Sequence, residues 1–134
     1  MSNPSINSIK FYCLDLNGNL KFSVPVDNKN GFVTSNATLG KDNNFYFATK
    51  YALVSMKTDG GINWAKEGLS SHLKNPVIYE DYLFVSSEMG LYIFDLNGNQ
   101  LQFFELQMDF YTPLITENYI YAGSRNGKLI IYKW

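Results

Sequence analysis

Apolar and polar residues alternate along several short segments of the chain, and turn residues separate these segments. Leu20, Phe22 and Val24, for example, alternate with Lys21 and Ser23. A period of two residues is typical of a half-buried β-strand. The joints read KDNN, YEDY, TENY, EMG and RNG, and Asn-Gly is a strong hairpin signal. Because no segment keeps a period of 3.6 residues, the pattern predicts an all-β fold with almost no helix.

One five-residue sequence, Asp-Leu-Asn-Gly-Asn, occurs at 15–19 and again at 95–99, and a related Lys-Thr-Asp-Gly-Gly stands at 57–61. Their central glycines, Gly18, Gly60 and Gly98, are 42 and 38 positions apart. A second landmark starts at Pro76 and Pro113, 37 positions apart, and runs through an apolar pair and an acidic turn into a strand. The chain is therefore predicted to repeat roughly every 40 residues.

Each repeat divides into four short segments with the composition of strands. Antiparallel four-stranded units at this period are typical of β-propeller blades, so we predict about three blades per chain. After a tail at 1–8, the predicted propeller segment covers 9–134: a half blade at 9–25, blades at 37–67 and 75–106, and a partial blade at 112–134. WD40 and kelch repeats share this period, but their Gly-His and Trp-Asp pairs or double glycines do not recur here.

The turn motif resembles the PQQ-like, quinoprotein-type propeller repeat, in which a strand is followed by Asp-x-x-Gly, three residues and an aromatic side chain. Three copies match in full or in part: Asp15, Gly18 and Phe22; Gly60 and Trp64; Asp95, Gly98 and Phe103 or Phe104. The middle copy has Lys57 in place of aspartate, and the last copy has an extra residue before its aromatic pair. The resemblance implies that Phe22, Trp64 and Phe103 or Phe104 dock between neighbouring blades.

The same resemblance bears on cofactors. Quinoprotein dehydrogenases of this family bind pyrroloquinoline quinone and calcium in a much larger closed propeller, and their cofactor and metal residues have no identifiable counterparts in this sequence. Other family members, among them an outer-membrane assembly lipoprotein, are cofactor-free interaction scaffolds. The resemblance therefore implies the fold, and we predict neither a cofactor nor a metal site.

An arc of three blades leaves apolar faces and strand edges without neighbours, whereas propellers typically have about 4–8 blades. We expect one of three arrangements: a piece of a longer propeller, two copies that complete a propeller together, or a smaller non-standard β assembly. The first two are favoured equally. In either of them the opening strands can complete the partial blade at 112–134, although one third strand is then surplus.

Composition narrows the classes of function. The chain has 134 residues, 11 basic and 12 acidic, with a formal net charge of −1, which argues against broad electrostatic binding to nucleic acid or to an anionic membrane. Its first residues lack a basic region and a long apolar stretch, so we expect neither a signal peptide nor a membrane insertion. Cys13 is the single cysteine, and its apolar surroundings predict a buried structural thiol. The sequence assigns no compartment.

Three patterns in the sequence have residue types that could carry chemistry. A helix-flanked calcium loop needs glycine at position 6 and glutamate at 12; counting from Asp15, glycine falls at 4 and Val26 at 12, so a tight turn is favoured. Glu80, Asp81 and Glu117 recur at one turn of the repeat, which favours solvated turn residues over a catalytic pair. The single histidine, His72, excludes a multi-histidine metal site within one chain.

The connections from a fourth strand to the next first strand are the longest and most varied loops, and binding residues concentrate in such loops. Asn36, Lys74 and Tyr111 occupy matched repeat positions there and differ chemically, and His72 and Asp109 lie in the same loops. We predict these five residues as a partner-binding set and no catalytic set. The function predicted is a non-enzymatic scaffold for a protein or peptide, or for a homodimer. A carbohydrate-binding or carbohydrate-cleaving propeller is the alternative, and a PQQ-dependent dehydrogenase fragment ranks lowest.

Overall fold

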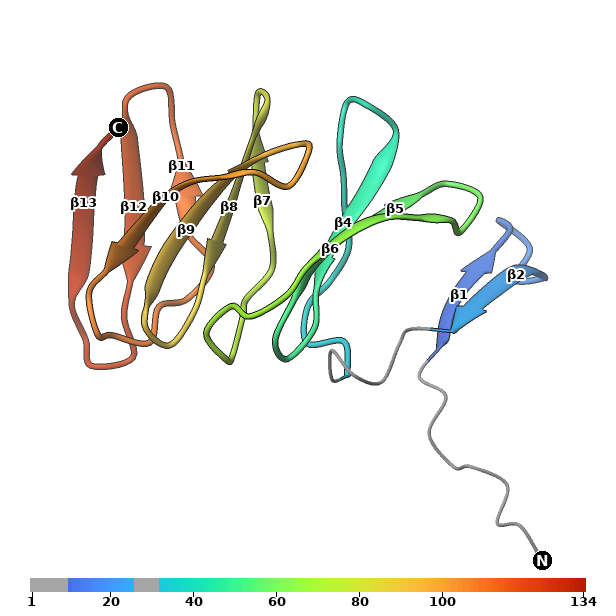
Figure 1. The fold of residues 1–134 in the computed structure, drawn as a ribbon, viewed down its shortest axis with the longest axis horizontal. Coiled ribbons are helices and arrows are strands. Elements are labelled where there is room, and N and C mark those ends of the chain that lie inside the picture. The colour runs from blue at the N-terminus through green and yellow to red at the C-terminus, as the bar shows by residue number, and fades with distance from the viewer. Residues whose placement is uncertain (1–9, 26–31) are drawn as a thin grey trace, which may run out of the picture.

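The computed structural model describes residues 10–25 and 32–134, so the predicted tail at 1–8 and part of the loop after the first hairpin lie outside it. The described residues form four antiparallel sheets and contain no helix. Figure 1 shows the sheets following one another along the long axis of the molecule, with β1 and β2 at one end and β13 at the other. The prediction of an all-β fold made of four-stranded antiparallel blades is confirmed.

The strands pair in chain order within every sheet. Hairpin β1–β2 contains β1 (Lys10–Leu14) and β2 (Leu20–Pro25). Sheet β3–β6 contains β3 (Thr38–Leu39), β4 (Asn44–Ala48), β5 (Leu53–Lys57) and β6 (Ile62–Lys66). Sheet β7–β10 contains β7 (Val77–Tyr79), β8 (Tyr82–Ser86), β9 (Gly90–Asp95) and β10 (Gln100–Glu105). Sheet β11–β13 contains β11 (Leu114–Ile115), β12 (Tyr119–Gly123) and β13 (Leu129–Lys133).

The turn between a third and a fourth strand has the same geometry in three places. In the two Asp-Leu-Asn-Gly-Asn copies, one carboxylate oxygen of Asp15 or Asp95 accepts hydrogen bonds from the backbone N–H groups two and four residues later. The other oxygen accepts one from the side chain of Asn19 or Asn99. The central glycines of the three copies have φ of 84°, 93° and 85°, a left-handed backbone that glycine adopts without steric cost. These carboxylates are engaged within the turns they stabilise.

A one-residue bulge follows each of these turns and decides which face each side chain of the fourth strand takes. The residue pairs beside the bulge are Phe22–Cys13, Trp64–Ser55 and Gln102–Ile93. Gln102 is therefore the equivalent of Phe22 and Trp64. Because side chains alternate across a strand, Phe103 and Phe104 lie on opposite faces of β10.

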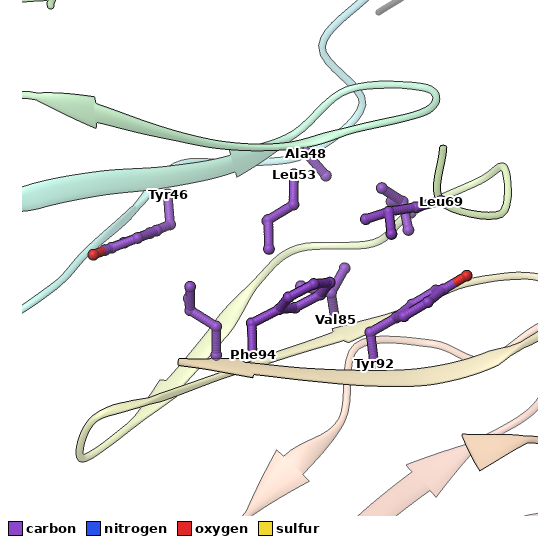
Figure 2. Close-up of a cluster of buried hydrophobic side chains, with 9 residues drawn as sticks. Tyr46, Ala48, Leu53, Leu69, Val85, Tyr92 and Phe94 are labelled. Carbon is purple, nitrogen blue, oxygen red and sulfur yellow. The ribbon is translucent and has the colours of Figure 1, made fainter. Parts of the chain in front are cut away.

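Neighbouring sheets pack face to face through apolar clusters. Figure 2 shows the largest cluster, where side chains from β4 and β5 face those from β8 and β9 and a leucine of the connecting loop lies beside them: Tyr46, Ala48, Leu53, Val85, Tyr92, Phe94 and Leu69. A second cluster joins Phe84 and Leu91 to Ile115 and Ile120, and a third joins hairpin β1–β2 to sheet β3–β6 through Phe11 and Phe47. Full burial of one such side chain contributes roughly 1.5–3 kcal/mol, so these junctions hold the row of sheets together.

An aromatic ring lies on a glycine at two of the three junctions. A Cβ atom on Gly60 would stand 3.0 Å from Cε2 of Phe22, and one on Gly98 would stand 2.9 Å from Cδ2 of Trp64. The indole Nε1 of Trp64 also donates a hydrogen bond to the carbonyl oxygen of Leu96, at 3.1 Å. Gly60 and Gly98 therefore allow a left-handed backbone and also leave room for the aromatic ring of the preceding sheet.

The third junction is built differently because Gln102 stands at the docking position. Here the large ring comes from the following sheet: Trp134 packs edge-on against Tyr82 and Phe84, with ring centroids 5.5 and 5.1 Å away. A hollow of about 210 Å³ remains between Gln102 and Trp134. Phe104 faces this junction and lies 4.6 Å from Tyr132, whereas Phe103 faces the preceding sheet and stacks on Tyr92 at 4.2 Å.

Candidate interaction site on the loop rim

One end of the sheets is formed by the loops at 67–76 and 106–113 together with the turns between second and third strands; we call it the loop rim. Backbone hydrogen bonds join these segments across neighbouring sheets. Leu69 N–H donates to the carbonyl of Tyr51 in the preceding sheet, and Lys74 N–H donates to that of Ser86 in the following sheet. The N–H of Arg125 likewise donates to the carbonyl of Asp109, at 2.9 Å. Each loop is thus fixed at both ends.

The loop at 67–76 is also anchored by buried side chains. Leu69 and Leu73 are 7% and 1% exposed and belong to the main core cluster. Between them, Ser70 receives its own support: its N–H donates to Oη of Tyr92 at 3.1 Å, and its hydroxyl donates to Oγ of Ser87 at 2.7 Å. The loop is therefore a rigid support for the polar side chains that follow Ser70.

His72 and Glu88 form one of these polar groups. The imidazole Nδ1 lies 2.8 Å from Oε2 of Glu88, and the hydroxyl of Ser71 donates to the other carboxylate oxygen. The Ser71 hydrogen bond, followed by that of His72, lowers the pKa of the Glu88 carboxyl below its ordinary value. A nucleophile relay needs one imidazole nitrogen on the carboxylate and the other on the serine. Here Nδ1 is the nitrogen near both groups, so the arrangement is a polar contact between His72 and Glu88 and not a relay.

Asp109 links two loops of the rim through ion pairs. Lys74 Nζ lies 3.1 Å from its Oδ1, and Arg125 Nη1 lies 3.2 Å from its Oδ2. The Lys74 contact is a charge pairing without the alignment of a directed hydrogen bond. Burial alone would raise the pKa of the Asp109 carboxyl, but Lys74 and Arg125 outweigh it and lower that pKa. Since the Asp109 side chain is only 23% exposed while that of Arg125 is 68% exposed, the guanidinium is the part presented to solvent.

The other two predicted rim residues are placed differently from each other. Tyr111 is 56% exposed, and its backbone is fixed because its carbonyl accepts a hydrogen bond from the Ser86 hydroxyl at 2.8 Å. Asn36 lies at the edge of the set and donates its N–H to Oδ1 of Asn75. Backbone bonding makes Thr34 the match of Tyr111, since its N–H donates to the corresponding carbonyl of the second strand. The repeat count placed Asn36 there, two residues too far along the chain.

Of the residues predicted from the sequence, His72, Lys74, Asp109 and Tyr111 lie on the rim, and Lys74 contacts Asp109 directly. Glu88 and Arg125 were missed because the sequences EMG and RNG were interpreted only as turns. Both residues directly follow the serine that opens the turn between a second and a third strand, and this match was the signal that could have identified them.

Within residues 10–25 and 32–134, no three His, Cys, Asp or Glu side chains come close enough to hold a metal ion together. Cys13 is a free, half-buried thiol. In the same part of the chain no helix has the length and apolarity that a membrane crossing requires. The carboxylates at the opposite end of the sheets are surface groups, of which Asp81 pairs with Lys41 at 2.8 Å.

Fold and rim together define a class: consecutive antiparallel β-propeller blades whose loops at one end are tied to each other by polar side chains. No family model matches the chain, and no curated protein matches it. Among solved structures, the chain is similar to BamB from Moraxella catarrhalis, with a TM-score of 0.49 and 17% identity over 95% of this chain and 52% of that one. It thus spans about half the length of that protein. It is also similar to the computationally designed Ika4 protein, with a TM-score of 0.42 and 10% identity over 75% of this chain and 90% of that one.

Proposed function

We propose that this chain is a non-enzymatic β-propeller module of the PQQ-like repeat type, and that it binds a protein or peptide partner through its loop rim. The observation that carries the proposal is the ion-paired link from Lys74 through Asp109 to Arg125, which fixes two loops to each other. Pre-ordered loops lose little conformational entropy on binding, so more of the contact energy appears as affinity. The rim is a support of this kind.

The exposed groups on the rim suit a macromolecular partner. Tyr111 and Arg125 extend from fixed backbone into solvent, and tyrosine and arginine are the residue types enriched among side chains that contribute most to protein interfaces. The contact between His72 and Glu88 adds hydrogen-bonding polar groups, as in the rim of an ordinary protein interface. We also propose, as a separate part of the function, that two copies of this chain associate.

The experiment is a selection of random peptides on the immobilised chain, followed by affinity measurements by calorimetry. Selected peptides are expected to bind the Tyr111→Ala and Arg125→Ala double variant at least about tenfold more weakly, because truncation of a tyrosine or arginine hot spot costs about 2 kcal/mol or more. The matched control is Asp81→Ala, an exposed ion-paired residue at the opposite end of the sheets. The rim proposal is wrong if selected peptides bind the double variant as tightly as the unchanged chain, or if an oligosaccharide array gives rim-dependent binding and the peptides do not.

A further inference from the structure

Sheet β11–β13 presents an apolar face that no described part of the chain covers. Four of its side chains are between 40% and 65% exposed: Leu114, Tyr119, Leu129 and Ile131. Tyr121 completes this face, because it pairs with Ile131 and Leu114 across the sheet. We call these five residues the outer face of β11–β13. The opposite side of the same sheet holds Ile115 and Ile120, which are buried against sheet β7–β10.

Strand register shows what the outer face of β11–β13 corresponds to. Tyr119 pairs with Lys133 as Tyr82 pairs with Asp95, and Tyr121 pairs with Ile131 as Phe84 pairs with Ile93. Leu114 pairs with Tyr121 as Val77 pairs with Phe84. Leu129 pairs with Gly123 as Leu91 pairs with Ser86. The five matching residues of that sheet all pack in the cluster against the next sheet: Val77, Tyr82, Phe84, Leu91 and Ile93. The outer face therefore has the composition and register of a blade-to-blade junction.

Hairpin β1–β2 carries the other half of such a junction at the far end of the row (Figure 1). Tyr12 and Leu14 are 60% and 56% exposed, and they stand three and one residues before the aspartate of the first Asp-Leu-Asn-Gly-Asn turn. At the same distances from the second turn stand Tyr92 and Phe94, which pack against the preceding sheet in the main core cluster. Leu20, opposite Leu14 in the hairpin, extends this apolar face.

We infer that a second copy of this chain covers both faces, with Tyr12 and Leu14 of one copy docked on the outer face of β11–β13 of the other. The outer face of β11–β13 matches the blade face that packs on the following sheet. Tyr12 and Leu14 of the hairpin match the blade face that packs on the preceding sheet, so the two surfaces are complementary. Each copy carries both halves, so two reciprocal contacts close a ring of two copies by symmetry. This inference rests on the proposed association of two copies and identifies the surfaces that it uses.

The test uses two substitutions of opposite charge at the two ends, Tyr12→Glu and Ile131→Lys. Sedimentation and light scattering are expected to show twice the chain mass for the unchanged protein and an association weakened at least about tenfold for each variant alone. An equimolar mixture of the two variants is expected to regain the doubled mass, because one contact is then unaltered and the other brings glutamate onto lysine. Ile62→Lys, at an exposed position of β6 in an inner sheet, is the matched control and keeps the doubled mass.

The possible failures are distinguishable. A single-chain mass for the unchanged protein at every concentration overturns both the association and the surfaces assigned to it. A doubled mass that persists in both single variants leaves the association standing and refutes these surfaces. Dissociation of only one of the two variants refutes the head-to-tail pairing, because a contact between two identical faces predicts that result. Failure of two dissociated variants to recover on mixing refutes it as well. Circular dichroism melts check that each variant is folded.

Discussion

Substitution of Gly98 by alanine tests whether the ring of Trp64 docks on the turn of the next sheet. Two costs are expected. The left-handed backbone of Gly98, at φ 85°, costs an alanine about 1–2 kcal/mol. The added Cβ would stand 2.9 Å from the indole ring. Forcing an extra atom into a packed contact costs a further amount of about 1–3 kcal/mol.

Two matched glycines separate these costs. Gly18 and Gly127 have φ of 84° and 82° and open space where a Cβ would stand, so alanine at either position carries the backbone cost alone. The excess for Gly98→Ala is therefore about 1–3 kcal/mol, or roughly 4–12 °C in Tm for a chain of this size. Denaturant unfolding followed by far-ultraviolet circular dichroism measures it, since fluorescence would be altered by any change at Trp64.

A double-mutant cycle assigns the excess to the ring. In the Trp64→Ala background the Gly98→Ala substitution is expected to cost only the backbone term, so the two changes are coupled by about 1–3 kcal/mol. Equal destabilisation at Gly98, Gly18 and Gly127 would refute the docking argument. An excess at Gly98 that survives removal of the ring would refute it as well.

Two further predictions concern buried or half-buried ionisable groups. Burial, followed by a 2.6 Å hydrogen bond to Asp42, raises the pKa of Tyr46 to about 12 from 10.0. The free energy of unfolding is therefore expected to fall as pH rises through that interval. In urea titrations, Tyr46→Phe is expected to abolish this fall and to cost about 1.5–3 kcal/mol of stability at lower pH. The lowered pKa of Asp109, beside Lys74 and Arg125, means that its stabilisation is present above 3.8 and lost as pH falls below it. Asp109→Asn is expected to lose about 1 kcal/mol near neutral pH and to unfold less steeply in acid, and an unchanged acid transition would contradict this.

The strands and turns were predictable because their signals are local. Alternation identifies a half-buried strand within a few residues, and the side chains of Asp15 and Asp95 bond to backbone groups within their own turns. The docking position on β10 gave conflicting signals. The seven-residue spacing from Asp15 to Phe22 and from Lys57 to Trp64 points to Gln102, whereas aromatic residue type pointed to Phe103 or Phe104. The strand register agrees with the spacing, because the bulge falls at the same place after all three turns.

The role of Trp134 could not be predicted from a local pattern. In the sequence it reads as the end of a third strand, and only the packing shows that it fills the junction that Gln102 does not. On the rim, loop length and chemical variation identified Lys74 and Asp109, but their pairing joins residues 35 positions apart. Arg125 lies in a turn of the next sheet, so its contact with Asp109 depends on how the sheets are stacked and not on any local pattern.

Each sheet contacts only the sheets beside it. This arrangement determines the order in which parts of the chain unfold. The free energy of such a row is close to a sum of sheet and junction contributions. In a single copy, sheets β3–β6 and β7–β10 have neighbours on both faces, so their amide protons are expected to exchange with solvent last. Hairpin β1–β2, which its own chain supports on one face, is expected to open first. Pulled from its two ends, the chain would unfold in discrete steps, one sheet and one junction at a time.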